Sequence, residues 1–208
     1  MGKKEELKDI IWEIWKISLN AKRFLQYSFY LHKPDTADEL EYLKTSRDFK
    51  FIARALWRNA VIELSKLFNS SKNRDKFNIF HFISKLEKNG HYRDFKIDQA
   101  KIDNWYAQID ENKKTIDLIN GLRDKVYAHT DGPSDKNGLD TPTFEQTEKL
   151  IVIIESVIKE IYSSIFNTHA MTDSPTLKLE PSKIIKVLAA EKKSRLKEVE
   201  NLLKKNND

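Results

Sequence analysis

Apolar residues recur every three or four positions along most of this chain, which is the spacing of an amphipathic helix. The first such run covers residues 5–32 and ends before Pro34. The second covers residues 37–69, begins with Thr36 and Glu39 as a capping box, and ends at the polar stretch "NSSKNRDK". The pattern therefore predicts two long helices in the first third of the chain.

Two further helices are predicted in the middle of the chain. The segment "NIFHFISKLEKNG" is typical of a short helix, with Gly90 as its left-handed cap. A long helix then runs from about residue 98 to His129, where Gly132 and Pro133 stop it. Its apolar face is predicted to consist of Ile102, Trp105, Ile109, Ile116, Ile119 and Val126.

The last third of the chain predicts two more helices. Thr143 and Gln146 cap a fifth helix, whose apolar positions follow an alternating spacing of four and three. These positions are Leu150, Ile154, Val157, Ile161 and Ile165. After the linker "HAMTDSPTLKLEP", a sixth helix is predicted at about residues 181–205, and it is basic.

Four long helices, one short helix and modest connections predict an all-α fold, because no segment shows the alternation of a strand. An antiparallel four-helix bundle over residues 1–170 is the natural architecture for such a set. Residues 171–208 are predicted to form a linker and a basic amphipathic helix. That helix could pack on the bundle, extend from it or dimerise, and the sequence leaves these three possibilities open.

Composition agrees with a helical protein and narrows its chemistry. The 208 residues include only five Gly and five Pro, which leaves little material for a turn-rich β fold. The lack of cysteine excludes disulfides, thiolate catalysis and cysteine-ligated zinc, and it fits a cytoplasmic protein. The N-terminus lacks the features of a secretion signal, and no apolar run reaches the length of a membrane span, so no membrane association is expected.

The positive charge of the chain is concentrated in the sixth helix. Residues 182–205 hold eight lysines and arginines and three glutamates, a net charge of +5 that equals the charge of the whole chain. The plain interpretation is a packing or dimer helix with a solvated face. The sharper one is attraction to RNA, for which the candidate residues are Lys192, Lys193, Arg195 and Lys197.

The stretch "NGLRDKVYAHTDGP" places Arg123 and His129 six residues apart at the end of the fourth helix. On a helix they lie about 120° apart and about 9 Å along the axis, with Val126 midway between them. Both therefore border one apolar face, where a guanidinium is costly unless it meets a partner. The plain alternative is an arginine paired with a carboxylate and a histidine at a helix C-terminus, where cations are favoured.

These residues resemble a known family. The segment "LRDKVYAHTD" resembles the signature of the HEPN superfamily, in which an arginine, a polar residue and a later histidine end a bundle helix. The upstream "ALWRNAVIELSKLFNSSKNRDKFNIFHFISKLEK" and the "AH-x-D" ending are similar to the abortive-infection AbiU-like branch. The resemblance covers roughly residues 10–170, and it implies a HEPN-like four-helix bundle.

The resemblance also implies a function. HEPN proteins of this kind are metal-independent endoribonucleases of toxin–antitoxin or phage-defence systems, and they dimerise so that the Arg and His of both chains face one cleft. By this resemblance His129 is the general acid/base and Arg123 stabilises the transition state, with no cofactor. Asp124 matches the polar position after the arginine, and Asp131 is expected to orient His129. An antitoxin or regulatory protein is an expected partner.

One departure from the family pattern is clear. HEPN toxins regulated by a nucleotidyltransferase carry a tyrosine two residues after the histidine, where this chain has Asp131. Regulation by modification of that tyrosine is therefore not expected here. The alternative function is a catalytically inactive helical module that binds nucleotide, RNA or a protein partner.

Other polar residues have plainer interpretations. Glu63 lies among apolar residues of the second helix, and it is expected either to support the site by pairing with an arginine or to form a rim salt bridge. No metal site is expected, because the aspartates of the fourth helix are spaced one heptad apart and fit a solvated face. They are Asp103, Asp110, Asp117, Asp124 and Asp131.

Overall fold

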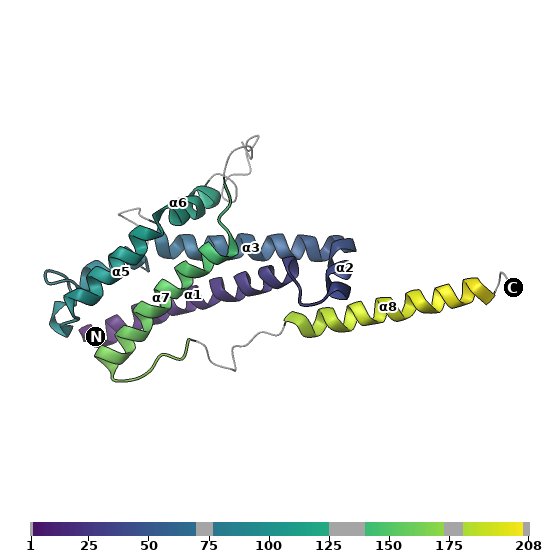
Figure 1. The fold of residues 1–208 in the computed structure, drawn as a ribbon. Helices are drawn as coiled ribbons and strands as arrows, with labels where there is room; N and C mark the ends of the chain where they lie inside the picture. Colours follow the sequence, from purple (N-terminus) through teal and green to yellow (C-terminus); the bar gives the residue numbers. More distant parts are fainter. Residues whose placement is uncertain (1, 70–76, 125–139, 173–180, 206–208) are drawn as a thin grey trace.

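A computed structural model describes residues 2–69, 77–124, 140–172 and 181–205 of this protein, and within these ranges it contains helices and no strand. The fold is the predicted all-α antiparallel bundle (Figure 1). Its four long members are α1 (Lys3–His32), α3 (Arg47–Phe68), the pair α5 (Gln99–Glu111) and α6 (Lys113–Leu122), and α7 (Phe144–Phe166).

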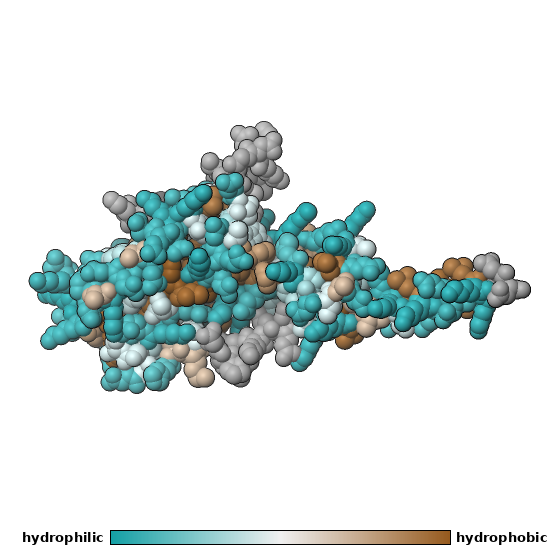
Figure 2. Space-filling model, viewed as in Figure 1, coloured by the Kyte–Doolittle hydropathy of each residue, from teal (hydrophilic) through white to brown (hydrophobic). Residues whose placement is uncertain are grey.

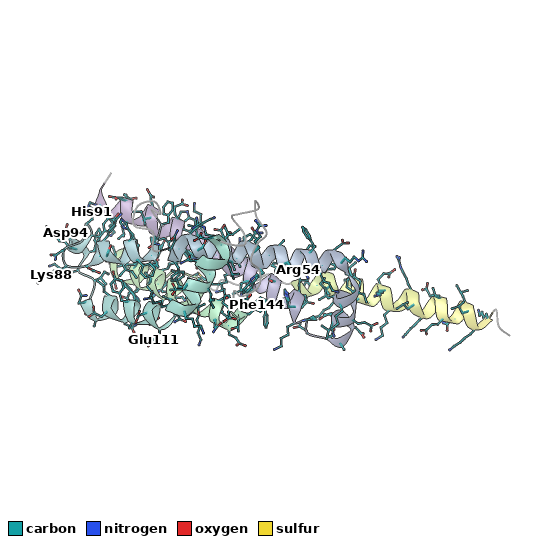
Figure 3. All side chains as sticks on the ribbon, turned by 90° about the horizontal axis from the view of Figure 1, so that it is seen from above. Arg54, Lys88, His91, Asp94, Glu111 and Phe144 are labelled. Carbon is teal, nitrogen blue, oxygen red and sulfur yellow. The ribbon has the colours of Figure 1, made fainter. Side chains whose placement is uncertain are left out.

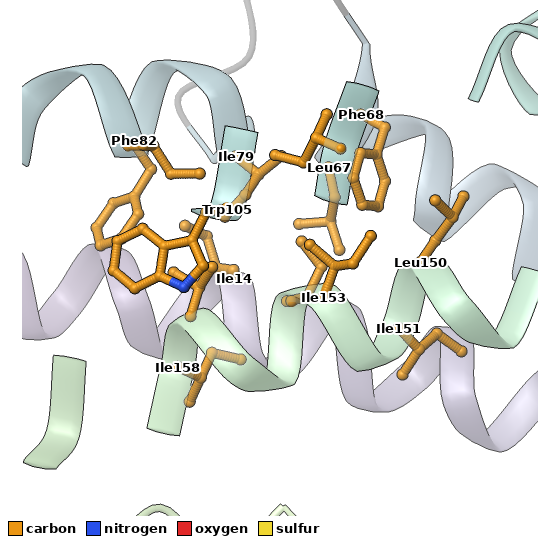
Figure 4. Packing of buried hydrophobic residues seen from close by; sticks show 14 of the residues in the cluster. Ile14, Leu67, Phe68, Ile79, Phe82, Trp105, Leu150, Ile151, Ile153 and Ile158 are labelled. Carbon is orange, nitrogen blue, oxygen red and sulfur yellow. The ribbon is translucent and has the colours of Figure 1, made fainter. Parts of the chain in front are cut away.

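The bundle core forms where the predicted apolar stripes face one another. α1 packs along α3 and also against α7, while α6 lies on α3 and α5 lies on α7. All five predicted positions of α7, from Leu150 to Ile165, are buried. Figure 4 shows side chains from several helices meeting in the core, among them Ile14 of α1, Leu67 of α3 and Trp105 of α5.

The prediction of a single helix over residues 37–69 is wrong in one respect, because the helix is interrupted at Ser46. α2 (Ala37–Thr45) has the predicted capping box of Thr36 and Glu39. Ser46 is extended, and its hydroxyl accepts a hydrogen bond from the amide of Phe49 to cap α3. A serine hydroxyl that satisfies an unpaired first-turn amide can start a new helix without any break in the apolar pattern.

The predicted fourth helix is also divided, at Asn112. The side chain of Asn112 donates a hydrogen bond of 2.8 Å to the carbonyl of Gln108, and its backbone leaves helical geometry. A side-chain amide that bonds the local backbone competes with the helical ladder. The apolar face nevertheless continues across the break, since Ile109 and Ile116 are both buried. Beyond Asp124, the predicted continuation to His129 lies outside the described residues.

The short helix α4 (Ile79–Leu86) is capped by Asn78, whose side chain accepts from the amides of Phe80 and His81. Gly90 does not have the predicted left-handed conformation. It follows the end of α4 by four residues, and a Cβ placed on it would lie 2.3 Å from the carbonyl oxygen of Lys85. Glycine is therefore needed for close backbone approach, just before the 3-10 turn η1 (Arg93–Phe95).

The basic helix α8 (Pro181–Lys205) combines two of the possibilities that the sequence leaves open. Its first half packs on α2 and on the end of α1, where Ile185 is buried with Tyr30 and Leu43. Its second half extends away from the bundle (Figure 1). Apolar groups are visible along that extension in Figure 2, and they belong to the exposed residues Leu196, Val199, Leu202 and Leu203.

The division of the chain at residues 170 and 171 remains a prediction. Ala170 still packs against the main core, whereas α8 buries Ile185 in a separate small cluster. None of the described helices has the length and apolar character that crossing a membrane requires.

Candidate active site at the end of α6

Arg123 lies directly after α6, at the point where the regular helix ends. Leu122 is buried, while Arg123 and Asp124 continue in a π-helical turn. The guanidinium of Arg123 lies 3.4 Å from the carboxylate of Asp124, and the two side chains are 41% and 62% exposed. The guanidinium is thus accessible from solvent, and the high desolvation cost expected from its place on the apolar stripe does not arise within one chain.

The end of α6 is held in place by its contacts with α3. Ile119 is fully buried, and the side-chain amide of Asn120 donates a hydrogen bond of 3.2 Å to the carbonyl of Phe68. A buried side chain and a directional hydrogen bond together fix the rotation of the last turn of α6 about the helix axis and its position along that axis. The position of Arg123 therefore depends on the packing of α6 against α3.

His129 and Asp131, the predicted acid/base and its orienting carboxylate, lie outside the described residues. Their roles, and their geometry relative to Arg123, stay predictions.

Glu63, predicted to support the site, lies on α3 with a largely buried side chain. Its carboxylate forms an ion pair of 2.6 Å with Lys66, one turn further along the same helix. This pair is the rim salt bridge that the sequence suggested as the plainer alternative. A supporting role for Glu63 in catalysis stays a prediction.

Three of the four candidate RNA-binding residues of α8 contact groups of their own chain. The ammonium of Lys193 lies 2.7 Å from the carboxylate of Asp38 on α2, and this hydrogen bond raises the pKa of Lys193 above its ordinary value. Lys192 donates to the hydroxyl of Thr45 and lies over the ring of Tyr42.

Further along α8, Arg195 pairs with Glu191 at 2.7 Å, and Lys197 is exposed. These interactions are at the surface and weak, so they reduce the positive potential of the helix without abolishing it. Attraction of RNA by α8 stays a prediction.

The structure also draws attention to residues of α3 that the sequence alone did not assign to a site. Arg54 lies near the first residue of α7, Phe144, at one end of the bundle (Figure 3). The Phe144 ring packs against three others, those of Phe29, His32 and Trp57, at centroid distances of 4.9 to 5.5 Å. The sequence feature that could have pointed to this region is the spacing of Arg47, Lys50, Arg54 and Arg58, at steps of three and four residues along α3.

In the part of the chain that the structure describes, no three histidine, aspartate or glutamate side chains gather into a group that could hold a metal ion. Four of the five aspartates spaced by heptads fall within the described residues, and all four are exposed, as predicted for a solvated face. They are Asp103, Asp110, Asp117 and Asp124.

Comparison with known proteins identifies the family. The AbiU2 family model, a HEPN family, matches residues 4–180, which is most of the chain and includes the whole bundle with Arg123 and His129. The chain has no match among curated proteins and none among solved structures. The helical architecture agrees with the HEPN bundle that the resemblance implied. This chain therefore belongs to the AbiU2 family of HEPN proteins.

Proposed function

We propose that this protein is a metal-independent endoribonuclease that acts in the cytoplasm in a toxin–antitoxin or phage-defence role. The observation that carries the proposal is the family match across residues 4–180, within which the Arg-x5-His spacing of Arg123 and His129 fits the HEPN signature. The accessible guanidinium of Arg123 at the end of α6 supports it, because a group that acts on a phosphate must be reachable by RNA.

In the proposed reaction, His129 removes the proton of an RNA 2′-hydroxyl, and the 2′-oxygen attacks the adjacent phosphorus. The bond from phosphorus to the 5′-oxygen breaks, and an imidazolium returns a proton to that leaving oxygen. The products are a 2′,3′-cyclic phosphate and a 5′-hydroxyl. Imidazole suits both steps, because its unperturbed pKa of about 6.5 lies close to neutral pH.

Arg123 would stabilise the negative charge that develops on the phosphorane oxygens. Guanidinium offers two parallel N–H donors in a planar fork, which matches two oxygens of a phosphoryl group. Asp124, 3.4 Å from this guanidinium, would hold it in position until the phosphate displaces the carboxylate. Asp131 would orient His129. Glu63 would support the site only indirectly, because its carboxylate pairs with Lys66 on the same helix.

A two-fold homodimer completes the proposed site. Two chains that meet near residues 119–131 would bring two copies of Arg123 and His129 to one cleft, so one histidine can act as base and the other as acid. The exposed cations of α8 would add long-range attraction for RNA. An antitoxin or regulatory protein would hold such an activity in check.

An RNase assay in excess EDTA tests this proposal. We expect wild-type protein to cleave RNA and to leave 2′,3′-cyclic phosphate ends. We expect His129→Ala to lower the single-turnover rate by ~10²-fold or more, the usual contribution of an acid/base group. Activity that disappears in EDTA, or products that carry only 3′-hydroxyls, would contradict the mechanism. A wild-type protein without RNase activity would favour the inactive module that binds nucleotide, RNA or a protein partner.

A further inference from the structure

Four cations of α3 lie on one face of that helix. Arg47, Lys50, Arg54 and Arg58 follow one another at steps of three, four and four residues. Such steps keep side chains on one side of a helix, and eleven residues span about 16 Å. All four residues are exposed. We call this set, together with the adjacent Phe51, the α3 basic face.

The α3 basic face continues in line with the face that α6 covers. The same row of positions runs on through Val61, Ser65 and Phe68, all of them buried. Phe68 receives the hydrogen bond from Asn120, and α6 packs on this half of α3 (Figure 1). The row is therefore buried as far as α6 reaches and basic beyond the end of α6, which is where Arg123 lies.

Three charges of this face have no ion-pair partner among the described residues. Within the part of the chain that the structure describes, no carboxylate lies within ion-pair distance of Arg47, Lys50 or Arg54. Lys193 and Arg195 of α8, in contrast, each have a carboxylate at 2.7 Å. A row of uncompensated cations attracts a polyanion more strongly than a row of paired ones.

An exposed aromatic ring and a hollow accompany the cations. Phe51 is 73% exposed, which is unusual for a phenylalanine that serves only the core. A hollow of about 240 Å³ adjoins the cations, because Lys50 and Arg54 line it together with His32 and four apolar residues, and no carboxylate lines it. Cations alternating with an exposed ring suit a single strand, whose phosphates meet the charges while its bases stack.

We propose that the α3 basic face binds a single-stranded segment of RNA and leads it to the end of α6. This inference rests on the proposed function for its direction, because it places the RNA strand between the face and Arg123. Its physical content is independent of catalysis. The cations contact successive phosphates, Phe51 stacks on a base, and the hollow receives a neighbouring nucleotide.

Binding is measured with a fluorescein-labelled 2′-O-methyl oligouridine, which has no free 2′-hydroxyl and so cannot be cleaved by the proposed chemistry. The test variant is the double substitution Lys50→Gln and Arg54→Gln. Its matched control is Lys88→Gln with Arg93→Gln, which removes two exposed cations. Figure 3 shows Lys88 and Asp94 at the opposite end of the bundle from Arg54, and the guanidinium of Arg93 lies 3.9 Å from the carboxylate of Asp94. A third variant, Phe51→Ser, removes the ring without changing the charge.

We expect the test variant to bind about tenfold more weakly and to lower the slope of log affinity against log salt by about 1.4, or about 0.7 for each phosphate that is no longer neutralised. Phe51→Ser should weaken binding by about fivefold or more at an unchanged slope, because stacking releases no counterions. The control variant should bind as wild type does. Equally weakened binding in the test and control variants would overturn the proposal, as would equally tight binding of a duplex.

Light scattering tests the main alternative role of this surface, which is an interface between two copies of the chain. If Phe51→Ser or the test variant turns a dimer into a monomer while the control does not, the face is an interface between two copies of the chain and the proposal is wrong. The binding proposal and the catalytic proposal can fail independently of each other. Binding that depends on the face in a protein that cleaves no RNA keeps this inference and rejects the RNase. Cleavage that needs His129 but is indifferent to the face does the reverse.

Discussion

The side-chain amide of Asn120 on α6 donates a hydrogen bond of 3.2 Å to the main-chain carbonyl of Phe68, the last residue of α3. Carbonyls in the last turn of a helix have no partner within that helix. Asn120 satisfies one of them, and the bond ties the end of α3 to α6 three residues before Arg123. The position of the candidate catalytic arginine is thereby coupled to the bundle core.

Substitution Asn120→Ala should lower the free energy of unfolding by about 1 kcal/mol, because the Phe68 carbonyl is left without this partner. The effect is limited, since Asn120 Oδ1 is buried without a hydrogen bond in the described structure and the variant removes this unfavourable group. RNA cleavage should slow at the same time. Urea denaturation measures the first effect, and Asn59→Ala, which removes an exposed hydrogen bond on α3, is the control that should change little.

Dimerisation is expected around residues 119–131, with Arg123 near the two-fold axis. The guanidinium is accessible in the single chain, so a second chain can reach it. Arg123→Glu should weaken the dimer. Arg93→Glu should not, because Arg93 lies outside the expected interface at residues 119–131. Light scattering at micromolar concentration gives the mass of each variant. A wild-type monomer under these conditions would contradict the expected assembly.

Truncation of α8 should have two distinguishable effects. Removing residues 194–208 deletes Arg195 and Lys197 but keeps the docked half, so stability should change by less than about 0.5 kcal/mol. RNA binding should weaken, and its salt dependence should flatten by about 0.7 for each phosphate that the helix no longer neutralises. Affinity measured at several salt concentrations tests this, with the substitution Lys88→Gln as a control for a general reduction of charge.

Removing residues 181–208 should in addition destabilise the protein. This deletion takes away Ile185, which is buried against Tyr30 and Leu43, and burial of one such side chain contributes roughly 1.5–3 kcal/mol. Thermal unfolding compares the two truncations. Equal stability of both would show that the docked half of α8 contributes nothing to the fold.

Substitution Gly90→Ala should destabilise the region between α4 and α5 by about 1–3 kcal/mol, because the added methyl carbon would lie 2.3 Å from a backbone oxygen that cannot rotate away. The carbonyl of Lys85 also accepts the amide of Tyr92 at 2.7 Å, so moving it disturbs a fully buried tyrosine. A thermal shift measures the effect. Gly2→Ala, with nothing within 4 Å of the new carbon, is the matched control.

The interaction between α5 and α7 should depend on pH through Glu160. The hydrogen bond from Lys101, followed by that from Ser164, lowers the pKa of Glu160 below its ordinary value of 4.5. A carboxylate with a lowered folded-state pKa stabilises the fold above its unfolded pKa, and this contribution disappears as the pH falls through the folded value. Glu160→Gln should therefore destabilise the protein at neutral pH, by less than about 1 kcal/mol because the pair is partly exposed.

The difference between Glu160→Gln and wild type should begin to close as the pH falls through 4.5 and disappear below the lowered folded-state pKa of Glu160, which unfolding curves at several pH values would show. Glu148→Gln, an exposed carboxylate on the same helix, is the control that should show a smaller effect. A difference that persists unchanged in acid would mean that the carboxylate charge is not the source of the stability.

Much of the fold follows from the sequence, for a local physical reason. The face of α7 from Leu150 to Ile165 is set by a repeat of three and four residues, and its start is set by Thr143 and Gln146, which form the predicted capping box. Both signals involve residues within one or two turns of each other, so they can be recognised without knowledge of the packing. The family signature of Arg123 and His129 is equally local.

Features that depend on distant partners emerged only from the packing of the helices. The apolar stripes run unbroken through Ser46 and Asn112, so periodicity could not show that each helix is divided there. The packing of Ile185 of α8 on Tyr30 of α1 depends on which surface the rest of the bundle leaves uncovered. The spacing of Arg47, Lys50, Arg54 and Arg58 is typical of one face of a helix, but for the same reason only the fold determines that α6 stops short of this face and leaves these side chains exposed.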